Sequence, residues 1–136
     1  MTLDPKQGEE AQEMEEVYQE HLMDHYRHPR NKRAMDDYTL VRREVNALCG
    51  DDLTVYIKLK QEKIVDVSFT GGGCAISQAA ASILTEELKG KEIKEIMALS
   101  DTRFLSLLGI PVSIPRQKCA FLCLKAIKGG IHHAGN

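Results

Sequence analysis

The fold is decided by residues 53–77, LTVYIKLKQEKIVDVSFTGGGCAIS. Apolar and polar side chains alternate on both sides of Gln61-Glu62. This period of two predicts two antiparallel strands that pair as a hairpin with one buried face, and it places Val65 on that face. The three glycines end the second strand, and the apolar spacing after Cys74 predicts a helix that Gly90 closes.

The flanking sequence predicts one more strand and several helices. A weaker alternation over residues 40–48 is typical of a strand. Apolar residues at spacings of three and four begin near Met14 and predict a first helix that ends near Arg27, before Pro29. Further helices are expected over residues 92–99, from a cap at Asp101 toward the loop 109–115, and from Arg116 to Gly129-Gly130.

Length and charge limit the kind of protein. A chain of 136 residues with 43% apolar content can bury one core, and we expect a single domain over 13–130 with flexible tails at 1–12 and 131–136. The formal charge of -2 provides no cationic field for nucleic acid. The sequence holds no apolar run long enough to span a membrane, and its first residues are acidic, so we expect a cytoplasmic protein.

Three of the four cysteines are predicted to lie at turns next to secondary structure. Cys49 precedes the second strand, Cys74 opens a helix after the glycines, and Cys119 falls in the first turn of the last helix. Free N–H groups at a helix amino terminus favour thiolate and lower a cysteine pKa. In a reducing compartment such cysteines indicate metal or sulfur chemistry more than disulfides, although an even number leaves disulfides open.

Asp51 is the candidate for a fourth ligand. Three soft thiolates and one carboxylate suit zinc or an iron–sulfur centre. A weaker fourth ligand is useful where bound cargo must leave again. Asp51 could instead be a turn residue that bonds to its own backbone.

These residues resemble the IscU, SufU and NifU amino-terminal family of iron–sulfur cluster assembly scaffold proteins. The resemblance covers about residues 16–130 and has its motifs in the family's order. The matching segments are His25-Tyr26, Pro29-Arg30-Asn31, Cys49-Gly50-Asp51, GGGCAIS at 71–77 with the Ala/Ser-rich helix start at 79–82, and Lys118-Cys119-Ala120.

The resemblance implies an α+β fold, in which a small three-stranded antiparallel sheet has helices packed on one side and a metal pocket at one end. It also implies a scaffold rather than an enzyme, which takes sulfur from a cysteine desulfurase, builds a transient [2Fe–2S] cluster and passes it to recipient apo-proteins. A homodimer or larger homo-oligomer around the cluster stays open.

Matching positions also imply the site residues. The implied metal ligands are Cys49, Asp51, Cys74 and Cys119, and Gly50, Gly73 and Lys118 lie next to the site. As in the IscU branch, Cys119 would accept the persulfide from an exposed position on the lip of the pocket.

Three departures from the family patterns make the chain intermediate between the branches and leave a second interpretation open. The IscU branch has a histidine before the last cysteine, where this chain has Lys118, as the SufU branch has lysine or arginine. The SufU branch carries an insertion between the second and third cysteines that this chain lacks. The chaperone-docking LPPVK motif is replaced by VSIPR at 112–116, so a dedicated Hsp70 partner is not expected.

The second interpretation is a zinc-dependent sulfur acceptor of the SufU type. Zn²⁺ would occupy the same site, Cys49 would take the persulfide, and the partner would be a SufS-like desulfurase. A third interpretation, of another class, is a structural zinc module that binds a protein partner.

The other candidate ligands are interpreted as structural. Cys123, one helical turn after Cys119, is expected to pack in the core rather than serve as a spare ligand or resolving thiol. His21 and His25 are expected to be core or interface residues, and His132 and His133 a solvated tail. Lys118 is either a surface charge or a partner of the Cys119 thiolate and Asp51.

Overall fold

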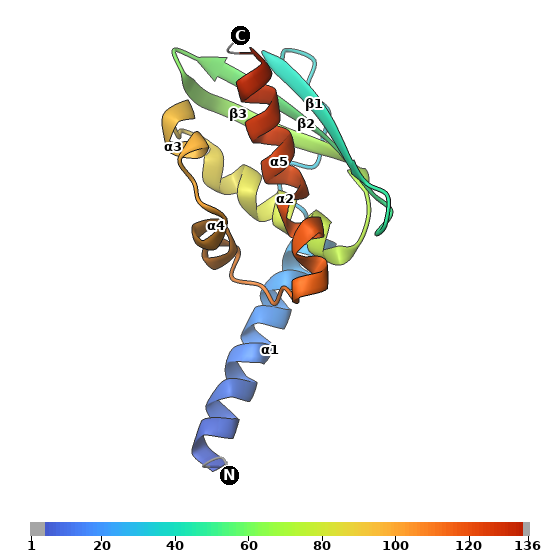
Figure 1. The fold of residues 1–136 in the computed structure, drawn as a ribbon, viewed down its shortest axis with the longest axis vertical. Helices are drawn as coiled ribbons and strands as arrows, with labels where there is room; N and C mark the ends of the chain where they lie inside the picture. Colours follow the sequence, from blue (N-terminus) through green and yellow to red (C-terminus); the bar gives the residue numbers. More distant parts are fainter. Residues whose placement is uncertain (1–4, 135–136) are drawn as a thin grey trace.

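The computed structural model describes residues 5–134, and side chains from residue 16 onward (Figure 1). Strands and helices follow one another along the chain in an α+β order. The elements are α1 (Pro5–Arg27), β1 (Leu40–Asn46), β2 (Asp51–Lys60), β3 (Lys63–Gly72), α2 (Ala75–Leu88), α3 (Ile93–Met97), α4 (Asp101–Leu108), the 3₁₀ helix η1 (Ile114–Arg116) and α5 (Gln117–Ala134).

The three strands form one antiparallel sheet in the order β1-β2-β3. The central residue Val55 pairs with Arg42 on one side and with Phe69 on the other. Helices α2 and α5 pack on one face of this sheet, and α1 packs on α2 (Figure 1). The predicted fold class, a small three-stranded antiparallel sheet with helices on one side, is therefore confirmed.

The hairpin between β2 and β3 differs from the predicted alternation in one detail. A register shift between Lys58 and Leu59 places Leu59 opposite Ile64. Ile64 is consequently buried, whereas Val65 is 45% exposed, so the prediction that Val65 faces the core is wrong. An irregularity of this kind changes which side chains face inward.

The core lies between the sheet and α2 with α5. Val55, Ile57 and Phe69 of the sheet are fully buried under Leu84 of α2 and Ile127 of α5. Ala79, Ala80 and Ala81 are also fully buried, and their small side chains let α2 lie close to its neighbours. This packing holds the starts of α2 and α5 near the same end of the sheet.

The last helix extends further than its sequence predicted. Gly129 and Gly130 were expected to end α5, but the helix continues through them to Ala134. A side chain at Gly130 would approach Leu40 Cδ1 to 2.8 Å, so the glycine permits close packing of α5 on β1. His132 and His133 therefore lie on a helix rather than in a tail, while residues 135–136 lie outside the described residues.

Two helix starts also differ from the expectations. Helix α1 begins at Pro5, inside the stretch expected to be a tail, and residues 1–4 lie outside the described residues. Its end at Arg27 is as predicted. Helix α4 is capped by Ser100, which accepts a hydrogen bond from the Arg103 N–H, and not by Asp101. The domain boundaries stay predictions.

None of the described helices combines the length and apolar character needed to cross a lipid bilayer.

His25 joins α1 to the rest of the fold. It is buried, and its Nδ1 lies 2.7 Å from Ser82 Oγ on α2. Ser82 Oγ also accepts a hydrogen bond of 2.9 Å from the Arg30 N–H. Burial, followed by the nearby Arg30 and His21 charges, lowers the pKa of His25, and the smaller effects of Asp24 and Glu86 oppose this.

We expect this histidine to make stability depend on pH. Its pKa is lower in the folded than in the unfolded protein, so the unfolded state binds the proton first as pH falls below about 6.5. The free energy of unfolding should therefore decrease below that pH, as measured by urea unfolding between pH 7.5 and 5. His25→Gln should flatten this slope and the exposed control His132→Gln should not; equal slopes in all three proteins would contradict the assignment.

Candidate functional site

Cys49 and Asp51 are positioned by the turn between β1 and β2. The Cys49 N–H donates to the Asn46 carbonyl at 3.3 Å, and Gly50 has a φ of 70°, which favours glycine. Asp51 opens β2 and is fully buried, whereas Cys49 is half-buried. The turn thus presents one accessible thiol next to one buried carboxylate.

The Asp51 carboxylate also holds the start of α2. Its Oδ1 accepts the Cys74 N–H at 2.8 Å and the Ser77 hydroxyl at 3.1 Å. Cys74 is the N-cap residue of α2, so Asp51 satisfies an N–H group that the helix itself leaves free. A side chain at Gly73 would come within 2.3 Å of Asp51 Oδ1, which requires glycine at that position.

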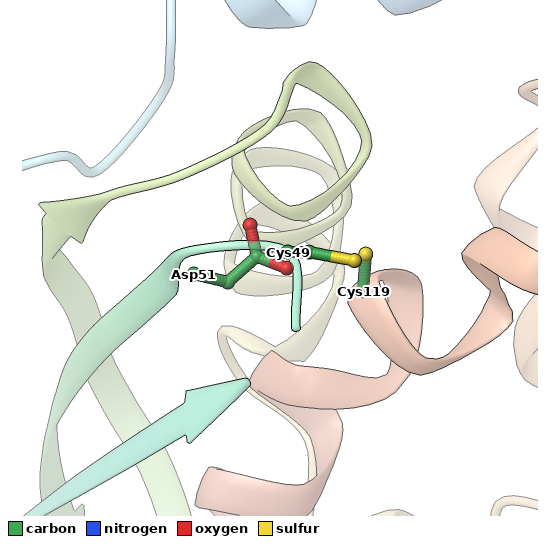
Figure 2. Close-up of side chains that lie close together, drawn as sticks. All are labelled: Cys49, Asp51 and Cys119. Carbon is green, nitrogen blue, oxygen red and sulfur yellow. The ribbon is translucent and has the colours of Figure 1, made fainter. Parts of the chain in front are cut away.

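Cys119, near the start of α5, lies next to Cys49 and Asp51. One ligand atom from each of Cys49, Asp51 and Cys119 lies within 4.8 Å of the other two (Figure 2). The Asn46 amide additionally approaches Cys119 Sγ, with Nδ2 at 3.7 Å. Three segments that are far apart in sequence therefore converge on one cluster of potential ligands.

The other predicted ligand lies at the edge of this cluster. Cys74 is half-buried and does not belong to the group of atoms within 4.8 Å, but it is close enough to contribute to the raised pKa of Cys119. In the described part of the chain, Cys123 and the histidines do not join any such group. Cys123 is fully buried, and burial raises its pKa to about 12, in agreement with a core role.

The electrostatics of Cys119 differ from the expectation. Its thiol was expected to be exposed and to have a lowered pKa at the start of α5, but the side chain is 0% exposed. Burial, followed by the nearby Cys49, Asp51 and Cys74 side chains, raises the pKa of Cys119 far above its usual value. Burial thus affects the pKa of Cys119 more than the amino terminus of the helix does. Cys119 is therefore a neutral thiol until a metal displaces its proton.

Arg116 is a residue of the site that the sequence analysis did not identify. It is exposed in η1, and its Nη1 lies 3.7 Å from Cys49 Sγ. A hydrogen bond with Cys119, followed by electrostatic interaction with Cys49, Cys74 and Cys119, raises the pKa of Arg116. It ends η1, which leads directly into α5, and its position three residues before Cys119 was the available signal.

Lys118 lies at the surface next to the site and does not pair with Asp51. Its side chain is exposed and lines a hollow with Val45, Asn46 and residues of α5. In the part of the chain that the structure describes, Lys118 forms no ion pair with Asp51. The cation that faces the cysteines is therefore Arg116.

The cluster has the chemistry of a metal site. Asp51 Oδ2 is buried and has no hydrogen-bond partner, which is costly unless another group occupies that position. Two sulfur atoms and one carboxylate oxygen suit zinc or iron, and a metal ion would supply the missing partner of Oδ2. The residues present thus fit a transition metal.

Comparisons with known proteins show which family the chain resembles. Residues 17–134 match the family described as the NifU-like N terminal domain. The zinc-dependent sulfurtransferase SufU of Bacillus subtilis is 33% identical over 87% of this chain and 91% of its own length. The iron–sulfur cluster assembly scaffold protein IscU of Escherichia coli is 36% identical over 85% of this chain and 91% of its own length.

A solved structure is similar along nearly the whole fold. It is the crystal structure of a candidate iron–sulfur cluster assembly scaffold protein for the SUF system, from Fervidobacterium islandicum. The TM-score is 0.73 at 27% identity, and the match covers 85% of this chain and 96% of that one. Together with the family match over residues 17–134, this shows that the chain belongs to the NifU-like N-terminal domain family.

Proposed function

We propose that this protein is an iron–sulfur cluster assembly scaffold, with Cys49, Asp51, Cys74 and Cys119 as the residues that hold the growing cluster. One observation carries the proposal. Ligand atoms of Cys49, Asp51 and Cys119 lie within 4.8 Å of one another, and the free oxygen of Asp51 is buried without a partner. The named relatives from the IscU and SufU branches support the same conclusion.

The ligand set suits cargo that must leave. Thiolates bind iron firmly, whereas a single carboxylate is a harder and more exchangeable ligand. Asp51 Oδ1 already accepts hydrogen bonds from the Cys74 N–H and the Ser77 hydroxyl, so only Oδ2 is free for a metal. The cargo would be a [2Fe–2S] cluster, which recipient apo-proteins take from the site.

Cys49 is the residue we assign to sulfur acceptance. Its thiol is half-buried next to the Arg116 guanidinium, whereas Cys119 is fully buried. The Cys49 thiolate would attack the terminal sulfur of a persulfide on a cysteine desulfurase. The new S–S bond forms on Cys49, the donor's S–S bond breaks, and the donor cysteine leaves as a thiolate.

A second candidate is the zinc-dependent sulfurtransferase function of SufU. The observation that favours it is the same accessible Cys49 beside a cation, which suits transfer of one sulfur atom without cluster assembly. The site residues would then hold Zn²⁺. The relative from Bacillus subtilis is named a zinc-dependent sulfurtransferase.

Metal content distinguishes the two functions. Protein purified without air and supplied with Fe²⁺, cysteine, a cysteine desulfurase and a thiol reductant, which provides the electrons that convert persulfide sulfur to sulfide, should develop a visible cluster absorption and transfer the cluster to an apo-ferredoxin. Tightly bound zinc that iron does not displace, with no transferable chromophore, would contradict the scaffold and favour the sulfurtransferase. Loss of the fold after chelation, measured by circular dichroism, would instead indicate a structural zinc module.

Sulfur loading tests the role of Cys49 and Arg116. After brief exposure to a loaded desulfurase, intact-protein mass spectrometry should show one added sulfur atom in the wild type and in Cys119→Ser, but none in Cys49→Ser. Arg116→Ala should slow loading about tenfold, since a charge-assisted contact to sulfur is lost. The exposed control Arg103→Ala should load normally; loading at Cys119 in the Cys49→Ser protein would contradict the assignment.

Asp51 controls release of the cluster in this account. Asp51→Asn keeps an oxygen that can accept the Cys74 N–H and the Ser77 hydroxyl but removes the carboxylate ligand, so it should lengthen the lifetime of the bound cluster and slow its transfer. The neighbouring carboxylate Asp52, whose side chain is 46% exposed and pairs with Arg43, provides the control Asp52→Asn. Decay of the visible absorption gives the lifetime, and faster decay in Asp51→Asn than in Asp52→Asn would show that Asp51 is a firm ligand instead.

A further inference from the structure

Ser77 carries a buried hydroxyl at the start of α2 that contacts the Asp51 carboxylate. Both side chains belong to residues that are 0% exposed. Ser77 Oγ lies 3.1 Å from Asp51 Oδ1 and 3.0 Å from the carbonyl oxygen of Cys74. A side chain at Gly73 would come within 2.9 Å of Ser77 Oγ and 2.3 Å of Asp51 Oδ1, so the backbone lies closely against both groups. The hydroxyl is thus held between two acceptors.

The hydroxyl has one proton for these two acceptors. A serine donates a single hydrogen bond, so Ser77 cannot serve Asp51 and the Cys74 carbonyl at full strength together. A hydrogen bond to an ionised carboxylate is roughly twice as strong as one to a neutral carbonyl. While Asp51 carries its full negative charge, the proton of Ser77 therefore points to Oδ1.

The buried charge of Asp51 depends on this hydrogen bond. Oδ1 accepts the Cys74 N–H at 2.8 Å and the Ser77 hydroxyl, whereas Oδ2 has no hydrogen-bond partner. Among residues 16–134, whose side chains the structure describes, no cation pairs with Asp51. Without a metal ion, the Cys74 N–H and the Ser77 hydroxyl are therefore the contacts that stabilise this carboxylate.

A metal ion changes the balance between the two acceptors. Figure 2 shows the two oxygens of Asp51 pointing in different directions, one of them toward the sulfur atoms of Cys49 and Cys119. A cation bound there withdraws negative charge from the carboxylate, so Oδ1 becomes a weaker acceptor. The Ser77 proton can then turn to the Cys74 carbonyl without movement of any heavy atom. Ser77 thus stabilises the carboxylate more without the ion than with it.

We propose that Ser77 is a positioning residue that acts through Asp51 and weakens the hold of the site on a metal ion. The inference rests on the proposed function, in which Asp51 is the exchangeable ligand. By thermodynamic linkage, a contact that is stronger without the ion than with it lowers the affinity for the ion. The Cys74 carbonyl serves as the second acceptor, so the buried hydroxyl keeps a partner while the ion is bound.

Zinc affinity tests this role, with Zn²⁺ alone as the probe. Competition with a chromophoric chelator gives the dissociation constant, and mixing with excess chelator gives the rate of zinc release. Ser77→Ala should bind Zn²⁺ about fivefold more tightly and release it more slowly, because the metal-free carboxylate loses a charge-assisted hydrogen bond. The matched control Ser82→Ala removes another buried hydroxyl of α2, which contacts His25, and it should keep the wild-type affinity.

A double-mutant cycle shows whether the effect passes through the carboxylate. In the Asp51→Asn background, Ser77→Ala should change the zinc affinity less than about twofold. Ala favours helix and removes only one oxygen atom, so Ser77→Ala should fold, which circular dichroism checks. A purely structural role of Ser77 would instead lower the zinc affinity, and would do so in both backgrounds.

The outcomes separate this inference from the proposed function. Unchanged or weaker zinc binding by Ser77→Ala, an equal effect in both backgrounds, or loss of the fold would overturn the role of Ser77. The proposed site would still stand if the wild type binds zinc and Cys49→Ser weakens that binding. A wild type that binds no zinc, or binds it equally well in Cys49→Ser, would overturn the proposed site and this inference with it.

Discussion

The buried Asp51 carboxylate is the contact on which the arrangement of the site depends. Its Oδ1 joins the first residue of β2 to the Cys74 N–H and the Ser77 hydroxyl at the start of α2. The same carboxylate lies next to Cys49 and Cys119. One side chain thereby fixes the β1–β2 turn, the start of α2 and the ligand cluster relative to one another, and it leaves a single oxygen without a partner.

The fold supplies the rigid frame around this contact. The sheet, α2 and α5 share one core, and the starts of both helices reach the end of the sheet at which Asp51 lies. Gly73 is required because a side chain would displace the Asp51 carboxylate. The cysteines differ in accessibility within this frame: Cys49 is half-buried, whereas Cys119 is covered. A rigid site in which Cys49 stays accessible can receive sulfur without unfolding.

Much of the fold could be predicted from the sequence, because strand alternation and helix periodicity are local patterns. The hairpin, the helix after Cys74 and the end of α1 at Arg27 are of this kind. The exposure of Val65 and the continuation of α5 through Gly129 and Gly130 depend on contacts between elements, namely a register shift and the close approach of Leu40. Local patterns do not contain that information.

The candidate site, too, could be predicted only in those features that depend on residue type and local sequence. The cysteines and Asp51 could be singled out by residue type and by resemblance to a family, but their burial could not. The covering of Cys119 reverses the expected direction of its pKa. Arg116 reaches Cys49 across 67 positions of sequence, so its role appears only when the chain is folded.

X-ray absorption at the zinc edge, on protein loaded with one Zn²⁺ per chain, shows whether the cysteines and Asp51 share one metal ion. If the cysteines and Asp51 bind the ion, the spectrum should show both sulfur at about 2.3 Å and oxygen at about 2.0–2.2 Å from the zinc. A shell of nitrogen and oxygen without sulfur would contradict it, because the metal would then lie away from the cysteines.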